Sequence, residues 1–91
     1  MQHVHLLEAI RKLVRRTFAE LGTVENFEVT EHVLLREDVY CGRRFQAGGL
    51  QAIWFIEEDE IKFHAQDGSV AYVMTSSDAE QLSELAERRA A

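Results

Sequence analysis

The stretch GGLQAIWFIEEDEIKFHAQDGSVAYVM, residues 48–74, decides the fold because it holds three apolar runs separated by two short polar turns. Asp67-Gly68 predicts a two-residue hairpin turn, since both residue types accept the positive φ that a type I′ turn requires. Glu58-Asp59 predicts a second turn of the same length. The three runs should therefore pair as antiparallel neighbours, with the middle run between the other two.

This pairing places Trp54 opposite Phe63 and Phe63 opposite Tyr72, and it separates the side chains into two faces. One face, called the core face, has no charged residue and contains Ala52, Trp54, Ile56, Ile61, Phe63, Ala65, Val70, Tyr72 and Met74. The other face, called the mixed face, contains Ile53, Phe55, Lys62, His64, Ala71 and Val73. A slip of one residue would bring Lys62 or His64 among the aromatic side chains, so the pattern itself favours this register.

The segment before these runs predicts a strand over residues 39–46 that turns back at Gly48-Gly49. The core face then gains Val39, Cys41, Arg43 and Phe45, and the mixed face gains Tyr40, Gly42 and Arg44. Arg43 is the one charged side chain on the core face of this strand, and near a sheet end its guanidinium can reach water. Gly42 in a strand interior indicates a bulge or a large neighbour, with Phe55 or Ile53 as the expected neighbour.

Residues 27–36, FEVTEHVLLR, predict a further strand whose register the pattern leaves open. Phe27, Val29, Val33 and Leu35 share one side of this strand, but Glu31 lies on the same side. A two-residue turn at Glu37-Asp38 would place Val33 and Leu35 on the mixed face. One residue more or fewer would place them on the core face.

Two helices are expected at the ends of the chain. Residues 4–21 predict an amphipathic helix whose apolar stripe consists of Leu6, Leu7, Ile10, Leu13, Val14, Phe18 and Leu21. Gly22 is expected to end this helix. A second helix is expected over about residues 78–89, with Ser77 and Glu80 forming a capping box at its start.

The expected order is helix, five-strand antiparallel meander, helix, in a single domain covering residues 1–91. The strands are expected at about residues 27–36, 39–46, 50–57, 60–66 and 69–74. Each helix must bury an apolar stripe, and the core face is the surface that accepts it. The fold class is therefore α+β, either a two-layer sandwich or a strongly twisted or curled sheet wrapped around the first helix. The alternative position for the C-terminal helix is over the mixed face.

The composition bounds the class of protein. Of the 91 residues, 46% are hydrophobic and 29% charged, which is typical of a globular domain. A net charge of −6 argues against non-specific binding to nucleic acid or anionic membrane. The single cysteine, Cys41, excludes an intrachain disulfide and favours a reducing compartment. With no pattern of a signal peptide and no long apolar run, a cytoplasmic location is expected.

No motif for catalysis or cofactor binding is apparent in the sequence, which lacks a phosphate loop, a dinucleotide fingerprint and a nucleophile elbow. The acidic run at residues 57–60 suggests a cation site but is better explained as a solvated turn. The four histidines lack the spacing of metal ligands. Cys41 is expected to point into the core beside Trp54 or Ile56 as a small apolar filler, and not to act as a nucleophile. We therefore expect no cofactor, no metal and no enzymatic activity.

The mixed face supports the hypothesis about function, because it is too apolar for a sheet surface left in water. An apolar patch with a basic and aromatic rim is typical of a binding or dimer surface. The predicted partner-binding residues are Tyr40, Arg44, Ile53, Phe55, Lys62, His64 and Val73. The chain is thus predicted to be a small protein-interaction module that forms a homo-oligomer, most simply a dimer, or docks a partner protein through this face.

The alternative function is a nucleic-acid-binding module that uses the basic side of the first helix. Four of the ten cations of the chain, Arg11, Lys12, Arg15 and Arg16, lie there within six residues. Such a stripe can contact a phosphate backbone. Glu8 and Glu20 flank it, which weakens the positive potential that a polyanion would meet.

Overall fold

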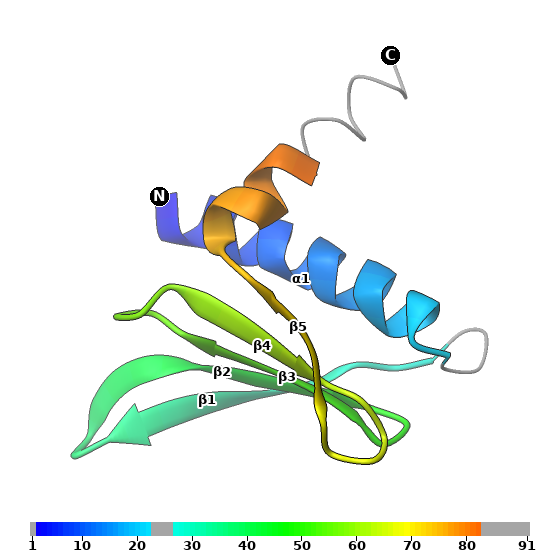
Figure 1. The fold of residues 1–91 in the computed structure, drawn as a ribbon. Helices are drawn as coiled ribbons and strands as arrows, with labels where there is room; N and C mark the ends of the chain where they lie inside the picture. The colour runs from blue at the N-terminus through cyan, green and yellow to red at the C-terminus, as the bar shows by residue number, and fades with distance from the viewer. Residues whose placement is uncertain (1, 23–26, 83–91) are drawn as a thin grey trace.

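The computed structural model describes residues 2–22 and 27–82, which form one helix, five strands and the beginning of a second helix. Helix α1 spans Gln2–Glu20, followed by β1 (Thr30–Arg36), β2 (Val39–Ala47), β3 (Leu50–Phe55), β4 (Glu60–His64) and β5 (Val70–Met74). The second helix occupies residues 76–82, and the rest of its predicted span lies outside the described residues. This order confirms the predicted α+β fold (Figure 1).

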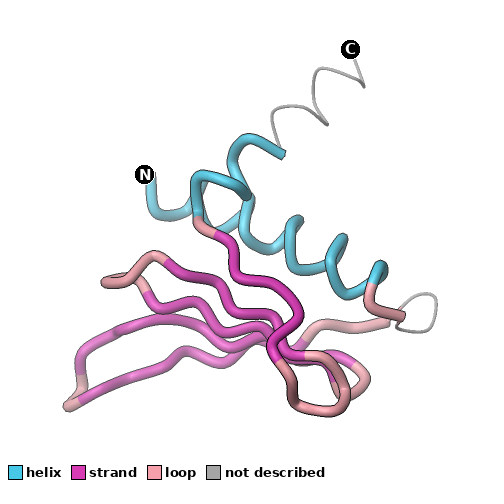
Figure 2. Tube along the Cα trace, in the orientation of Figure 1, coloured by secondary structure: helices cyan, strands magenta, loops and turns pink. Residues whose placement is uncertain are grey.

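The five strands form one antiparallel sheet in the order β1-β2-β3-β4-β5, so each strand pairs with its neighbours in the chain. Both helices lie over the same side of this sheet, which gives two layers (Figures 1 and 2). The sheet stays open, with β1 and β5 as separate edges. The strong curling that the sequence allowed is therefore not observed.

The apolar stripe of α1 supplies one half of the core. Ile10, Val14 and Phe18 are fully buried, as the spacing of three and four residues predicted. The ring of Phe18 meets Phe63 edge-on, with the ring centroids 6.2 Å apart. Gly22 follows the helix with a φ of 101°, the left-handed conformation of a residue that ends a helix.

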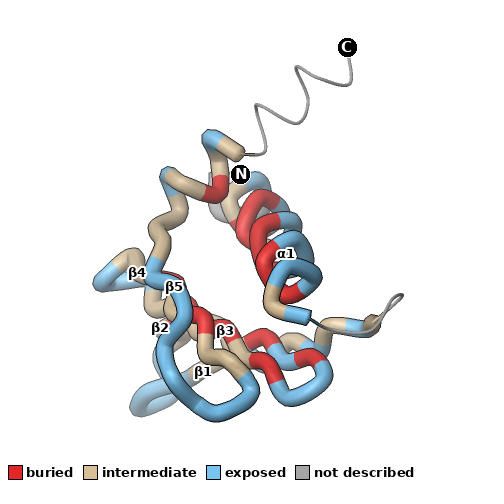
Figure 3. The backbone as a smooth tube through the Cα atoms, turned by 45° about the vertical axis from the view of Figure 1, so that its right-hand side comes forward, coloured by how far each residue is buried: buried red, intermediate tan, exposed pale blue. Residues whose placement is uncertain are grey.

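The core face of the sheet supplies the other half (Figure 3). Its buried residues are Phe45, Ala47, Leu50, Ala52, Trp54, Ile61 and Phe63. Four residues predicted to lie on the core face, Val39, Ile56, Val70 and Tyr72, are exposed instead. Ile56 lies in a turn, while Val70 and Tyr72 belong to the edge strand β5, whose side chains are mostly exposed.

The register between β3 and β4 differs from the prediction by two residues. Trp54 lies opposite Ile61, and the connecting turn has four residues, 56–59, instead of the predicted two. Asp59 takes a positive φ of 51° and turns its carboxylate inward, where it accepts hydrogen bonds from Trp54 Nε1 and from Ser76. Because a shift of two residues does not change the side of the sheet to which a side chain points, the residues of β3 and β4 keep their predicted faces.

The hairpin between β4 and β5 keeps the predicted pairs near its open end, including Phe63 opposite Tyr72. Its loop differs, because Ala65 pairs with Ser69 and only Gly68 has a positive φ, of 88°. The loop therefore holds three residues, and the register shifts between Phe63 and His64. A loop of this length is commonly accompanied by a bulge.

A bulge in β2 resolves the open register of β1. The turn at Glu37-Asp38 does have two residues, both with positive φ. One extra residue, Cys41, lies between Tyr40, which pairs with Leu35, and Gly42, which pairs with Leu34. The extra residue reverses the side on which the preceding residues point, so Val33 and Leu35 join the core face. The bulge also removes Cys41 from the core: it is half-buried, and its Sγ donates to the Leu34 carbonyl oxygen.

The second helix begins two residues earlier than predicted. Thr75 and Asp78, and not Ser77 and Glu80, form the reciprocal pair at its start: the Thr75 amide donates to Asp78 Oδ2, and the Asp78 amide donates to Thr75 Oγ1. Ala79 is buried in the core, so this helix packs on the core face. In the part of the chain that the structure describes, no helix is long and apolar enough to span a bilayer.

The close approach of Gly42 to the backbone of β3 predicts that this position tolerates no side chain. A Cβ at this position would lie 1.9 Å from the carbonyl oxygen of Trp54, a backbone atom that cannot move without disturbing β3. We expect Gly42→Ala to lower the free energy of unfolding in urea by about 3 kcal/mol or more. Gly22→Ala is the control, because nothing lies within 4 Å of its Cβ and only backbone strain of about 1 kcal/mol applies. Equal losses in the two variants would contradict the close approach.

Candidate interaction surface

The mixed face lies on the side of the sheet that neither α1 nor the described part of the second helix covers (Figure 1). One residue from each strand forms a row across it, in the order His32, Arg44, Ile53, Lys62 and Val73. The neighbouring row contains Leu34, Gly42, Phe55 and Glu60. The sheet thus places five of the predicted binding residues together on this face, and His64 extends the group along β4.

The centre of the mixed face is apolar. Ile53 and Phe55 are half-buried on the central strand β3, which has a paired strand on each side. Gly42 lies opposite Phe55 and has no side chain to cover the ring. Val73, on the edge strand, is half-exposed. Covering this surface with a second molecule would remove apolar area from water, which is favourable for association.

Two cations flank this apolar centre. Arg44 lies on one side of Ile53 and Lys62 on the other, each directly opposite it in the sheet. Within the described residues neither side chain forms an ion pair, although the chain has 16 acidic and 10 basic residues. Glu60 is the one acidic residue of the two rows. The mixed face is therefore locally basic on an acidic protein, which favours contact with carboxylates.

Tyr40 does not belong to this surface, which corrects the prediction. The bulge at Cys41 turns it to the core face, where its hydroxyl accepts a hydrogen bond of 2.9 Å from Arg43 Nε. The Arg43 guanidinium also lies 5.5 Å from the centroid of the Tyr40 ring, within the range of a cation–π contact. The sequence contains no direct sign of the bulge except Gly42.

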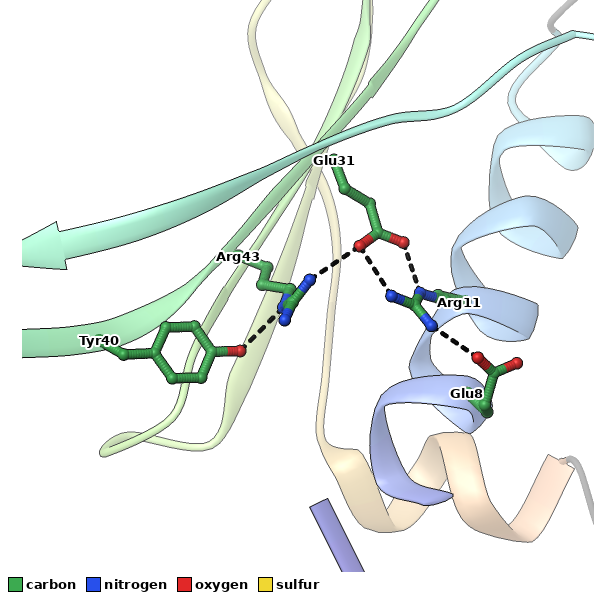
Figure 4. Close-up of polar contacts among 5 residues, drawn as sticks. All are labelled: Glu8, Arg11, Glu31, Tyr40 and Arg43. Carbon is green, nitrogen blue, oxygen red and sulfur yellow. Dashed lines mark hydrogen bonds and ion pairs between the residues drawn. The ribbon is translucent and has the colours of Figure 1, made fainter. Parts of the chain in front are cut away.

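A charged network on the core face is the feature that the sequence reasoning missed (Figure 4). Glu31 Oε2 accepts hydrogen bonds from Arg43 Nη1 at 3.0 Å and from Arg11 Nη2 at 3.1 Å, and Arg11 Nε donates to Glu31 Oε1. Arg11 also pairs with Glu8. The network ties α1 to β1 and β2, and it gives Arg43 a partner in place of the predicted route to water. Opposite charges at core-face positions of neighbouring strands were the available signal.

The network sets the electrostatics of its members. The pKa of Glu31 is lowered, mainly by its hydrogen bonds from Arg11. Partial burial opposes this lowering, and the hydrogen bond and charge of Arg43 add to it. The hydrogen bonding to Glu31 raises the pKa of Arg11 above its ordinary value. Both groups therefore stay charged at neutral pH, and the network acts as a structural tie and not as a proton donor.

The basic stripe of α1 is divided by this network. Arg11 faces the sheet, whereas Lys12, Arg15 and Arg16 are exposed. Arg16 lies 3.7 Å from Glu20, an exposed pair. The remaining stripe is short, and no observation in the structure favours a polyanion over ordinary solvation of a helix surface.

The described residues contain no group of three or more His, Cys, Asp or Glu side chains placed to hold a metal ion. Within the acidic run at residues 57–60, Asp59 anchors the start of the second helix by accepting a hydrogen bond of 2.9 Å from Ser76 Oγ. His64 Nδ1 lies 3.3 Å from the Gly68 carbonyl oxygen within its own hairpin. These contacts give Asp59 and His64 local structural roles.

The network predicts that Glu31→Gln lowers stability in a pH-dependent way. The variant leaves two guanidinium groups without their carboxylate, so we expect a loss of about 1–3 kcal/mol in the free energy of unfolding at pH 7. Because the pKa of Glu31 is lowered on folding, its contribution is present above pH 4.5, the ordinary value, and disappears as the pH falls below it. Glu28→Gln, at an exposed position, should change stability by less than about 0.5 kcal/mol. A loss that is the same at pH 3 and pH 7 would contradict the network.

No family model, curated protein or solved structure matches this chain. The case for a function therefore rests on the geometry and charge of the mixed face.

Proposed function

We propose that this chain is a small, non-enzymatic protein-interaction module whose mixed face docks a partner protein. The partner presents an apolar side chain with carboxylates beside it. The observation that supports this proposal is the position of Arg44 and Lys62, two cations without an ion pair among the described residues, on either side of Ile53.

The apolar centre supplies the driving force in this proposal. Phe55 and Ile53 would lose their remaining exposure under a partner, and Val73 would extend the contact to the sheet edge. Buried apolar and aromatic residues near the middle of an interface usually account for most of its binding free energy. Gly42, opposite Phe55, is itself buried, so a partner would contact the Phe55 ring and not the Gly42 backbone.

The cations determine which partner fits. Two copies of the mixed face pressed together about a twofold axis would bring Arg44 and Lys62 near their own copies, which opposes association. A partner with Asp or Glu on either side of its apolar residue would instead form ion pairs at the rim. Charge complementarity therefore favours an acidic partner over a second mixed face.

A library of random peptides displayed on phage tests this proposal. Selection on the immobilised wild-type chain, with depletion on the Phe55→Asp variant, should enrich peptides that combine an aromatic or aliphatic residue with Asp or Glu. In fluorescence polarisation, Phe55→Asp should weaken the binding of an enriched peptide at least about tenfold. Arg44→Glu should also weaken the binding of this peptide, and the loss should grow as the salt concentration falls, because repulsion between carboxylates replaces attraction.

Val33→Asp is the matched control, since Val33 is a half-exposed apolar residue on the other side of the same sheet. It should leave the peptide affinity unchanged. Circular dichroism must show that each variant keeps its fold. Failure to enrich any peptide on the wild type, or enrichment of basic peptides, would overturn the proposal.

A further inference from the structure

The edge strand β5 offers a second surface, separate from the centre of the mixed face. Among the described strands β5 pairs only with β4, so one side of its backbone has no strand neighbour. Val70, Tyr72 and Val73 are 52%, 45% and 52% exposed, more than any residue of the central strand β3. An edge with unpaired backbone groups and exposed apolar side chains is a template for a further strand.

The two edges of the sheet differ in charge. The opposite edge, β1, carries Glu31, His32 and Arg36, and charged side chains discourage pairing with another chain. In contrast, the stretch from Gly68 to Ser77 contains no charged residue and includes the whole of β5. Val33 and Leu35 on β1 are also exposed, so the two edges differ in the charged residues of β1 and their absence from β5.

The sequence of β5 is suited to pairing with itself. If two copies run antiparallel about Tyr72, this residue meets its own copy and Ala71 meets Val73, while Val70, which pairs with His64, lies beyond the irregularity at Ala71. Every such pair is apolar or aromatic, and pairs of this kind stabilise a sheet. No like charges meet, although each chain has a net charge of −6.

We propose that β5 pairs antiparallel with β5 of a second copy of this chain, forming a twofold dimer with one continuous sheet. Tyr72 lies on the core face, opposite Phe63, so the two Tyr72 rings meet beside the helix layer. The mixed faces of the two copies remain open on the other side. The dimer therefore presents two docking surfaces at once, which raises the avidity for a partner with two binding segments.

Sedimentation velocity of the full chain at concentrations between about 1 and 500 µM tests the dimer. Because an interface made by one pair of strands is small, we expect a dissociation constant on the order of micromolar. Tyr72→Lys places two lysines opposite each other on the twofold axis, and Tyr72→Glu does the same with carboxylates. Each variant alone should be monomeric throughout this range. An equimolar mixture of the two should restore the dimer, because opposite charges then face each other across the axis.

Val70→Lys is a second disrupting variant in case Tyr72 proves necessary for folding, and Val33→Lys, on the β1 edge, should leave the dimer intact. Phe55→Asp should also leave it intact, so this experiment is independent of the docking proposal. A wild type that stays monomeric at the highest concentration would overturn the inference. So would a dimer that Phe55→Asp disrupts, or failure of the lysine and glutamate variants to pair when mixed.

Discussion

The packing of α1 against the core face of the sheet is the interaction on which the rest of the structure depends. A helix in a protein owes most of its stability to packing of its apolar face, and an isolated sheet would leave Trp54 and Phe63 exposed. Together they bury Phe18 and Phe63 in a single core. The second helix adds Ala79 to the same core and not to the opposite face. In the described residues both helices therefore lie on one side of the sheet, and neither covers the mixed face.

The charged network explains how this packing is oriented. A carboxylate between a helix and a sheet is costly unless every charge has a partner. Glu31 meets that condition because Arg11 approaches from α1 and Arg43 from β2. The three side chains fix the helix over the β1 side of the sheet in a way that apolar contacts alone do not specify. Arg11 is thereby removed from the basic stripe, which leaves Lys12, Arg15 and Arg16 as the exposed cations of α1.

The sequence predicted the two faces more reliably than the details of pairing. The predicted sides are correct for Trp54, Phe63, Ile53 and Phe55. Strand periodicity decides only which side of the sheet each residue points to, because successive side chains alternate between the two sides. The shift of two residues at the turn 56–59 preserved that alternation, and nothing in the local sequence indicated that Asp59 would turn inward to Ser76.

The misplaced residues have a different cause. The bulge at Cys41 adds one residue and therefore reverses a face, which is why Tyr40 left the predicted site. Val70 left the core face for the same kind of reason, since the irregularity in β5 pairs it with His64 on the mixed face. Of the predicted surface, Arg44, Ile53 and Lys62 needed only correct alternation, and they lie together as expected.

The central claim is that one side of the sheet is covered and the other is open, and two isoleucines test it directly. Ile53 and Ile61 lie on the adjacent strands β3 and β4 but point to opposite faces. Methyl NMR in the presence of a soluble gadolinium chelate measures how closely solvent approaches each side chain. We expect the δ-methyl relaxation rate of Ile53 to rise several-fold more than that of Ile61. Equal protection of the two methyl groups would mean that part of this chain or a second copy covers the mixed face, and would contradict the account.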